Sequence, residues 1–210
     1  MEVKKEKVMI FIDGSNFYHG LKNHIDNTKI DFLKFSQLLC GDRELVRTYY
    51  YNVPVNQEAF PDTYRDQQKF FDSLKKVPYF EVKLGRLEKR TIKADRQGLI
   101  ETFGEKTTNE IIEKLGEINV TYVEKGVDID LATDMLRLAY NNAYDTAIIV
   151  TGDGDFVSAV KGVKDMGKHV ENANFKEGKG YHLRTACDKF IPLDKDFLAP
   201  CLRKNKEGNK

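Results

Sequence analysis

The chain alternates between short, almost wholly apolar runs and longer stretches in which apolar residues recur every three or four positions. Two runs are the most apolar, Val8–Ile12 and Thr146–Val150, and each passes directly into a sequence rich in aspartate and glycine. A central strand of a parallel sheet has this pattern, because both of its faces are covered, and aspartate and glycine are typical of the turn that follows. The two runs therefore predict two core strands.

Helical spacing is clear in several of the intervening stretches. Leu131, Met135 and Leu138, for example, form one apolar stripe of a predicted helix. The pattern predicts helices over residues 15–22, 31–40, 60–76, 130–140, 156–166 and 181–187, and further strands over 44–53, 79–87, 120–124, 169–171 and 190–193.

Strands and helices alternate along the chain, which predicts a three-layer α/β fold with a mainly parallel central sheet. The chain has 210 residues, and it contains neither an internal repeat nor a linker rich in proline, glycine or serine. We therefore expect a single domain over residues 1–202, followed by a polar tail over 203–210. Residues 90–117 are polar and mixed in charge, and they predict a long loop or a hairpin insertion.

Composition narrows the functional classes. No apolar run is long enough to span a membrane, and the three cysteines are scattered and odd in number, so we expect reduced thiols and a cytoplasmic protein. The formal net charge is +1, so affinity for nucleic acid would have to come from a local patch. The densest basic run lies between Lys83 and Arg96.

That basic run supplies four candidate contacts for the phosphates of a nucleic acid, namely Arg86, Lys89, Arg90 and Lys93. The alternative is a strand edge whose charges are simply solvated and protect it from unwanted pairing.

Four aspartates stand out by their position. Asp13 follows the first core strand, Asp153 and Asp155 follow the later one, and Asp128 lies at the entry to the helix that contains Leu131. In parallel α/β sheets, ligands bind outside the carboxyl ends of the strands, where the strand order reverses. Carboxylates brought together there repel unless a cation lies among them or a proton is shared. Oxygen ligands without nearby cysteine or histidine suit Mg²⁺ or Mn²⁺.

Each aspartate also has an ordinary structural explanation. Asp13 could belong to a plain turn, Asp128 or Asp130 could cap the following helix, and Asp155 could cap the helix after the second core strand. Taken together, the aspartates favour a site, because both of the most apolar strands end in aspartate at the same edge. Asp134 is assigned to a face away from the Leu131 stripe, where Arg137 or solvent can satisfy it. It ranks with Ser15 and Asp130 as an accessory candidate only.

Three motifs in register resemble the NYN domain family, most closely its LabA-like branch within the PIN-like nuclease superfamily. They are Phe-Ile-Asp-Gly-Ser-Asn at 11–16, Lys-Gly-Val-Asp at 125–128 with Leu131, Ala132 and Asp134 after it, and Val-Thr-Gly-Asp-Gly-Asp-Phe at 150–156. The resemblance runs from about residue 6 to about residue 195. One departure is Gly154, where many relatives carry serine or threonine.

The resemblance implies a PIN-like Rossmannoid fold, Mg²⁺ or Mn²⁺ at the acidic cluster, and cleavage of RNA phosphodiester bonds. Carried over by position, the metal-site and catalytic roles go to Asp13, Asp128, Asp153 and Asp155, with Asn16 as a polar helper. RNA, expected to be single-stranded, is the implied partner, and a homodimer is left open.

The residues leave two other functions in view. One is a non-catalytic RNA-binding or regulatory protein that retains the nuclease fold. The other is a Mg²⁺-dependent phosphatase, which would need an aspartate nucleophile and a lysine placed for phosphate, and no such pairing is visible in the sequence. We favour the ribonuclease, because a site that has lost its metal has no physical reason to keep like charges crowded together.

Overall fold

The computed structural model describes residues 5–93, 95–115, 118–176 and 180–203, without the side chains of residues 91–93, 115 and 118–121. The chain separates into two compact units. The larger combines residues 1–85 with 126–210, and the smaller consists of residues 86–125. We describe each unit by itself.

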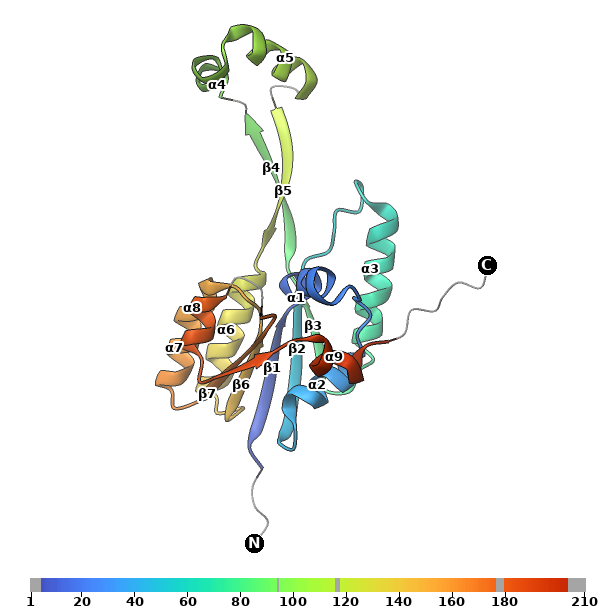
Figure 1. Cartoon of the computed structure of the whole chain (residues 1–210), viewed down its shortest axis with the longest axis vertical. Helices are drawn as coiled ribbons and strands as arrows, with labels where there is room; N and C mark the ends of the chain where they lie inside the picture. The colour runs from blue at the N-terminus through green and yellow to red at the C-terminus, as the bar shows by residue number, and fades with distance from the viewer. Residues whose placement is uncertain (1–4, 94, 116–117, 177–179, 204–210) are drawn as a thin grey trace, which may run out of the picture. The chain divides into compact units, whose positions relative to one another are not determined.

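The described part of the larger unit contains a parallel sheet of six strands (Figure 1). The strands are β1 (Lys7–Asp13), β2 (Glu44–Asn52), β3 (Phe80–Leu84), β6 (Thr146–Val150), β7 (His169–Asn174) and β8 (Lys189–Pro192). They lie in the order β3-β2-β1-β6-β7-β8, and every neighbouring pair is parallel. The predicted fold class, an α/β domain with a mainly parallel sheet, is therefore confirmed. The chain order reverses between β1 and β6, which makes that junction the topological switch point.

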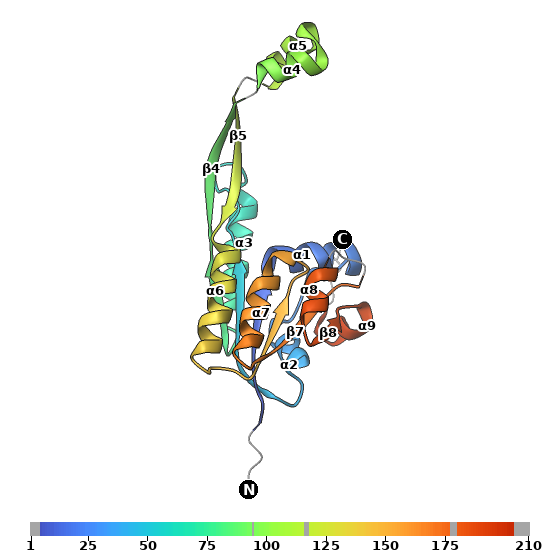
Figure 2. The same ribbon diagram turned by 90° about the vertical axis from the view of Figure 1, so that its left-hand side faces the viewer.

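Helices cover both faces of this sheet, as Figure 2 shows. One face packs against α1 (Gly14–Gly20), the π-helical turn η1 (Leu21–Ile25), α2 (Phe32–Cys40) and α3 (Pro61–Leu74). The other face packs against α6 (Val127–Tyr140) and α7 (Val157–Asp165). The remaining helices are the short η2 (Gly154–Phe156), α8 (Tyr181–Ala186), α9 (Lys195–Leu198) and η3 (Ala199–Cys201).

Alternation along β1 explains why the two core runs are apolar throughout. Ile10 and Ile12 point into the cluster under α1 and α2, whereas Phe11 points to the α6 face, where its ring stacks on Tyr49 with centroids 5.6 Å apart. All residues of β6 are buried as well. Each fully buried side chain of this size contributes about 1.5–3 kcal/mol. The two central strands are thus firmly held, and so is the edge at which they end.

The smaller unit is an antiparallel hairpin of β4 (Arg86–Lys93) and β5 (Ile118–Lys125), with α4 (Arg96–Phe103) and α5 (Glu105–Leu115) between the strands. Of the two predicted alternatives for residues 90–117, the structure has the hairpin, and it also has two helices that the sequence did not predict. Whether the chain as a whole folds as one domain stays a prediction.

Two predicted strand boundaries were wrong. The strand expected over 79–87 ends at Leu84, because the Gly85 amide bonds to the Asn52 carbonyl (2.9 Å) and the chain then begins a new pairing at Arg86. The strand expected over 169–171 continues to Asn174. The sequence did not predict this extension, because buried strand residues are usually apolar, whereas β7 buries Asn172 and Asn174.

Three further expectations concern the C-terminal tail, the cysteines and membrane-spanning helices. Residues 204–210 of the expected tail lie outside the described residues, and Arg203 pairs with Asp31 at 3.4 Å. Cys40, Cys187 and Cys201 are free thiols, as expected. None of the described helices is long and apolar enough to cross a membrane.

Candidate metal and phosphate site at the switch point

Asp13 is the last residue of β1 and at the same time caps α1. Its Oδ1 accepts a hydrogen bond from the Asn16 amide at 3.0 Å, and its Oδ2 accepts one from the Thr151 hydroxyl at 3.0 Å. The turn can be this tight because residue 14 is glycine, where a Cβ would lie 2.4 Å from the Tyr50 ring. Asp13 is therefore held rigidly at the switch point, and only 7% of it is exposed.

Thr151 links Asp13 to the second aspartate motif. Its Oγ1 accepts a hydrogen bond from the Asp153 amide at 3.2 Å while its hydroxyl donates to Asp13. Asp153 in turn caps η2, since its Oδ1 accepts from the Asp155 amide at 2.9 Å. The two strand ends are thus joined by one chain of hydrogen bonds. Asp13 and Asp153 converge, as expected for neighbouring strands. Thr151, for which the sequence suggested no role, links the two.

Asp128 lies in the first turn of α6, and its role there is not capping. Gly126 occupies the N-cap position, and no side chain caps this helix. The capping explanation considered for Asp128 and Asp130 is therefore wrong. Asp128 is exposed, and partial burial of its carboxyl, together with the charges of Asp153 and Asp155, raises its pKa.

The carboxylates influence one another's ionisation. The pKa of Asp13 is raised to about 6, mainly by burial and also by the charges of Asp128 and Asp153, which together outweigh the lowering effect of its two hydrogen bonds. Within the described residues, none of Asp13, Asp128, Asp153 and Asp155 takes part in an ion pair. The four predicted site residues are therefore electrostatically coupled and have no basic side chain to balance them.

The side-chain conformations present do not form a closed metal site. In the part of the chain that the structure describes, no three His, Cys, Asp or Glu side chains are arranged to surround one ion. The donor set itself fits a hard cation, because every donor is oxygen. The bonds to Asp13 and Asp153 still leave lone pairs free, since each carboxylate oxygen carries two. Asp128 and Asp155 are exposed on the surface.

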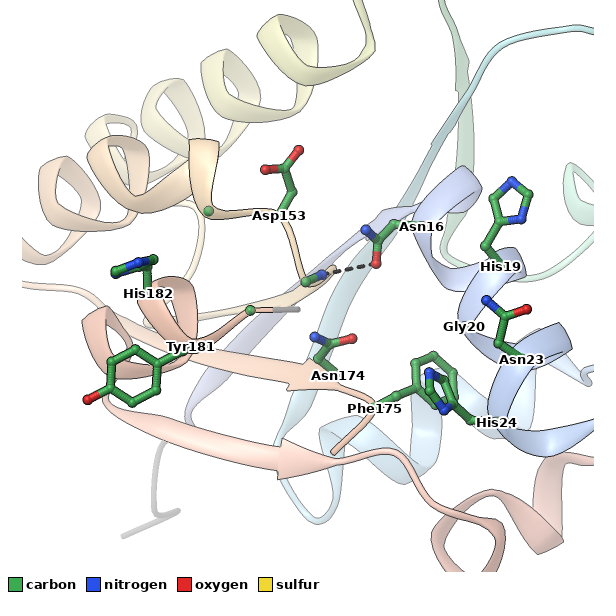
Figure 3. A pocket seen from close by; sticks show the side chains of 13 residues that line it. Asn16, His19, Gly20, Asn23, His24, Asp153, Asn174, Phe175, Tyr181 and His182 are labelled. Carbon is green, nitrogen blue, oxygen red and sulfur yellow. Dashed lines mark hydrogen bonds between the residues drawn. The ribbon is translucent and has the colours of Figure 1, made fainter. Parts of the chain in front are cut away.

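Asn16 contributes through both its backbone and its side chain. Its amide N–H holds Asp13, and its side-chain Oδ1 accepts a hydrogen bond from the Gly152 amide at 3.0 Å, drawn as a dashed line in Figure 3. This bond leaves the Asn16 amide nitrogen turned away from Gly152. Of the accessory candidates, Ser15 is half-buried in the first turn of α1, and Asp130 is exposed on α6.

Asp134 belongs to a different part of the fold, and its assignment to a face away from the apolar stripe was wrong. Its position three residues after Leu131 and four before Leu138 puts it on the same helical face, and only 6% of it is exposed. It accepts hydrogen bonds from Tyr51 (2.9 Å), Lys83 (2.6 Å) and, as predicted, Arg137 (2.8 Å). Burial would raise the pKa of Asp134, but these three bonds hold it below its ordinary value.

The predicted RNA-contacting residues lie on β4 of the hairpin unit. Arg86, Lys89 and Arg90 are exposed. Alternation along the strand puts Arg86 and Arg90 on one face of the hairpin and Lys89 on the other. Lys93 is the last residue of β4, and its side chain lies outside the described residues. Lys83, which belongs to the same basic run, is engaged with Asp134.

Thr151 could have been found from the sequence, because it stands between the apolar run of β6 and Asp153. Asn172 and Asn174 at the end of β7 carry a similar signal, namely polar residues at the carboxyl end of the next strand. Asn172 is fully buried and donates to the Thr151 carbonyl at 2.9 Å, so it supports the loop that contains Asp153.

Comparisons with known proteins agree with this architecture. A solved structure of a protein of unknown function from Vibrio parahaemolyticus, VPA0982, is similar with a TM-score of 0.65 and 22% identity, covering 94% of this chain and 99% of that one. An uncharacterized protein of Methanocaldococcus jannaschii, MJ0482, is 32% identical over 71 residues, which are 34% of this chain and 30% of that protein. The chain therefore spans less than a third of that relative. The model of the NYN domain matches residues 7–194, and the chain therefore belongs to the NYN domain family.

Proposed function

We propose that the chain is a divalent-metal-dependent ribonuclease of the LabA-like branch, which hydrolyses RNA phosphodiester bonds at Asp13, Asp128, Asp153 and Asp155. The family is of nuclease type. The observation that carries the proposal is the placement of Asp13, a buried carboxyl at the switch point that hydrogen bonds through Thr151 join to Asp153. Like charges held together without a basic partner are compensated when a cation binds.

Asp13 and Asp153 would provide the fixed ligands, and the exposed Asp128 and Asp155 would complete the set by side-chain rotation. A divalent ion held there polarises a phosphate oxygen and neutralises charge on the leaving oxygen. The chain's own contribution is positioning. Thr151 fixes the orientation of the Asp13 carboxylate, and the Asn16 amide group is available to donate to a phosphate oxygen beside it.

One observation favours the second candidate, a non-catalytic RNA-binding protein with the same fold. The described side chains do not present a ready ligand set for an ion. A panel of RNA and DNA oligonucleotides, incubated with Mn²⁺, Mg²⁺ or EDTA, separates the two functions. The ribonuclease predicts RNA cleavage that requires the metal. Metal-independent binding without cleavage of any oligonucleotide would favour the alternative.

The exposed basic residues of β4 lead to a prediction about salt. If an RNA backbone follows one face of the hairpin, the double variant Arg86→Gln/Arg90→Gln should flatten the log-affinity versus log-salt slope by about 1.4, or about 0.7 for each contact to a single strand. Affinity for unrelated sequences should fall about equally, because phosphate contacts carry no sequence information. The variant Lys89→Gln tests whether RNA contacts the opposite face of the hairpin. The variant Lys93→Gln tests the fourth predicted contact.

Binding is measured in EDTA across a salt series, so that no RNA is cleaved. The matched control is Arg65→Gln/Lys69→Gln, since both residues are exposed on α3 and each pairs with a carboxylate three positions earlier. An unchanged slope in all the β4 variants would show that these residues are a solvated strand edge.

A further inference from the structure

A cleft of about 450 Å³ opens beside the carboxylates at the same edge of the sheet. Asn16 and Asn23 line it from α1 and η1, Tyr181 and His182 line it from α8, and Asp153 borders it (Figure 3). The volume falls within the range of about 300–1,000 Å³ that is typical of sites for small ligands. The cleft is therefore large enough for one nucleotide, and it adjoins the proposed site of cleavage.

Two glycines allow the residues that line the cleft to pack closely together. Gly180 has a φ of +148°, and a Cβ there would lie 2.9 Å from the Asn174 side-chain nitrogen and 3.1 Å from the Gly152 carbonyl oxygen. On the opposite wall, a Cβ on Gly20 would lie 2.1 Å from the Phe175 ring. Glycine is therefore required at both positions by the packing of the lining itself, which keeps Phe175 and the 152–153 turn at the cleft.

The lining suits a nucleobase better than a phosphate. No lysine or arginine is among the described residues that line the cleft. Instead it combines the amides of Asn16 and Asn23, which can both donate to and accept from a base edge, with rings that can stack on a base face. His24 is stacked on Phe175 with centroids 5.4 Å apart. Tyr181, at the first position of α8, is 74% exposed.

The backbone of η1 is unusual at this position. Asn23 and His24 both lie in the π-helical turn Leu21–Ile25, which interrupts the regular helix after α1. Single π-helical turns occur frequently at functional sites. The interruption falls where the helix borders the cleft.

We propose that this cleft receives the base of an unpaired nucleotide next to the phosphate that a divalent ion at Asp13 and Asp153 would bind, with Tyr181 stacking on the base. The substrate class is then single-stranded RNA, because a base in a duplex would first have to leave its stack, which costs a few kcal/mol. This inference rests on the proposed function, because it places the base beside a cleavage site at Asp153, the aspartate that also borders the cleft.

Binding without cleavage tests the cleft separately from catalysis. The probes are single-stranded RNA decamers that are identical except for the position of one 2-aminopurine base. Binding is measured with EDTA present. Stacking quenches 2-aminopurine fluorescence, so the wild type should quench it at one position. Tyr181→Ala should remove the quench and weaken binding about 5- to 150-fold, the range for loss of one stacked base. Tyr181→Phe should retain both.

The matched control is Tyr140→Ala, because Tyr140 is 81% exposed at the far end of α6 from Asp128. Asn23→Ala, also at an exposed position, should weaken binding without changing the fold. If Tyr181→Ala binds like the wild type, or if the decamer annealed to its complement binds as tightly as the single strand, the inference is wrong. If the variants behave as expected but no metal supports cleavage, the cleft assignment stands and the ribonuclease proposal fails.

Discussion

Replacing Asp13 by asparagine is expected to abolish RNA cleavage and, without divalent metal, to raise the melting temperature. Loss of a ligand should reduce the rate by more than about 100-fold, since loss of residues that merely support ligands already costs 10- to 100-fold. The gain in stability has a separate origin. The variant no longer buries a charge beside Asp128 and Asp153. Its amide oxygen can still accept from the Asn16 amide, and its amide nitrogen can donate to the Thr151 hydroxyl oxygen in place of the bond that the carboxylate accepts there.

The pH dependence of the free energy of unfolding tests whether the buried charge of Asp13 is the source of this gain in stability. The pKa of Asp13 is about 6 in the folded chain against an ordinary value of 3.8. The folded state therefore holds this proton more tightly than the unfolded state. Ionisation of Asp13 lowers the free energy of unfolding progressively between about pH 4 and pH 6, and the full loss, about 3 kcal/mol, is present above that range.

The stability advantage of Asp13→Asn in EDTA should accordingly be small at about pH 4 and reach about 1–3 kcal/mol at about pH 8. Urea titrations of wild type and variant at the two pH values measure it. An advantage of the same size at both would show that ionisation of Asp13 is not its source. Cleavage retained by the variant would remove Asp13 from the active site.

Replacing Asp134 by alanine is expected to destabilise the protein by about 3 kcal/mol while leaving the response to metal intact. The substitution leaves the buried Tyr51 hydroxyl without its acceptor and removes the partner of Lys83. Losses of 1–3 kcal/mol follow from one buried unsatisfied group, and breaking a partly buried ion pair adds to them. Urea unfolding measures the change, and Asp130→Ala, at an exposed position four residues earlier, should stay within about 0.5 kcal/mol of wild type.

The Mn²⁺ response distinguishes this structural role from an accessory role at the site. An ion that binds only the folded state raises the melting temperature as its concentration rises. Asp134→Ala should show the same increment as wild type, whereas Asp13→Asn should show little. A normal stability with a lost Mn²⁺ increment would place Asp134 among the ligands instead.

The parts of the site that were predictable are those that depend on local pattern. The apolar runs of β1 and β6 predict two core strands that both end in aspartate at the same edge of the sheet. The structure makes these strands neighbours, with the strand order reversing between them. The burial of Asp134 was also predictable, because helical spacing alone places it on the buried face with Leu131. Its partners Tyr51 and Lys83 come from distant strands and could not be read from the sequence.

The hairpin unit was harder to predict for a physical reason. The helix α4 has no buried residue, so its sequence lacks the apolar stripe by which amphipathic helices are recognised. The cleft was missed for another reason. Asn23 is far in sequence from Gly180 and Tyr181, and none of the three has a chemical signature individually. They line one cleft only because α8 and η1 border the same edge of the sheet.

Cleavage of one single-stranded RNA by five proteins in parallel tests whether the four aspartates act together on RNA. They are wild type, Asp13→Asn, Asp128→Asn, Asp153→Asn and Asp155→Asn, each with Mn²⁺ and with EDTA. We expect cleavage by wild type only with metal, losses above about 100-fold for the Asp13 and Asp153 variants, and smaller losses for the variants of the exposed Asp128 and Asp155. Equal cleavage by wild type in EDTA, or wild-type rates in both the Asp13 and Asp153 variants after removal of contaminating nuclease, would contradict this expectation.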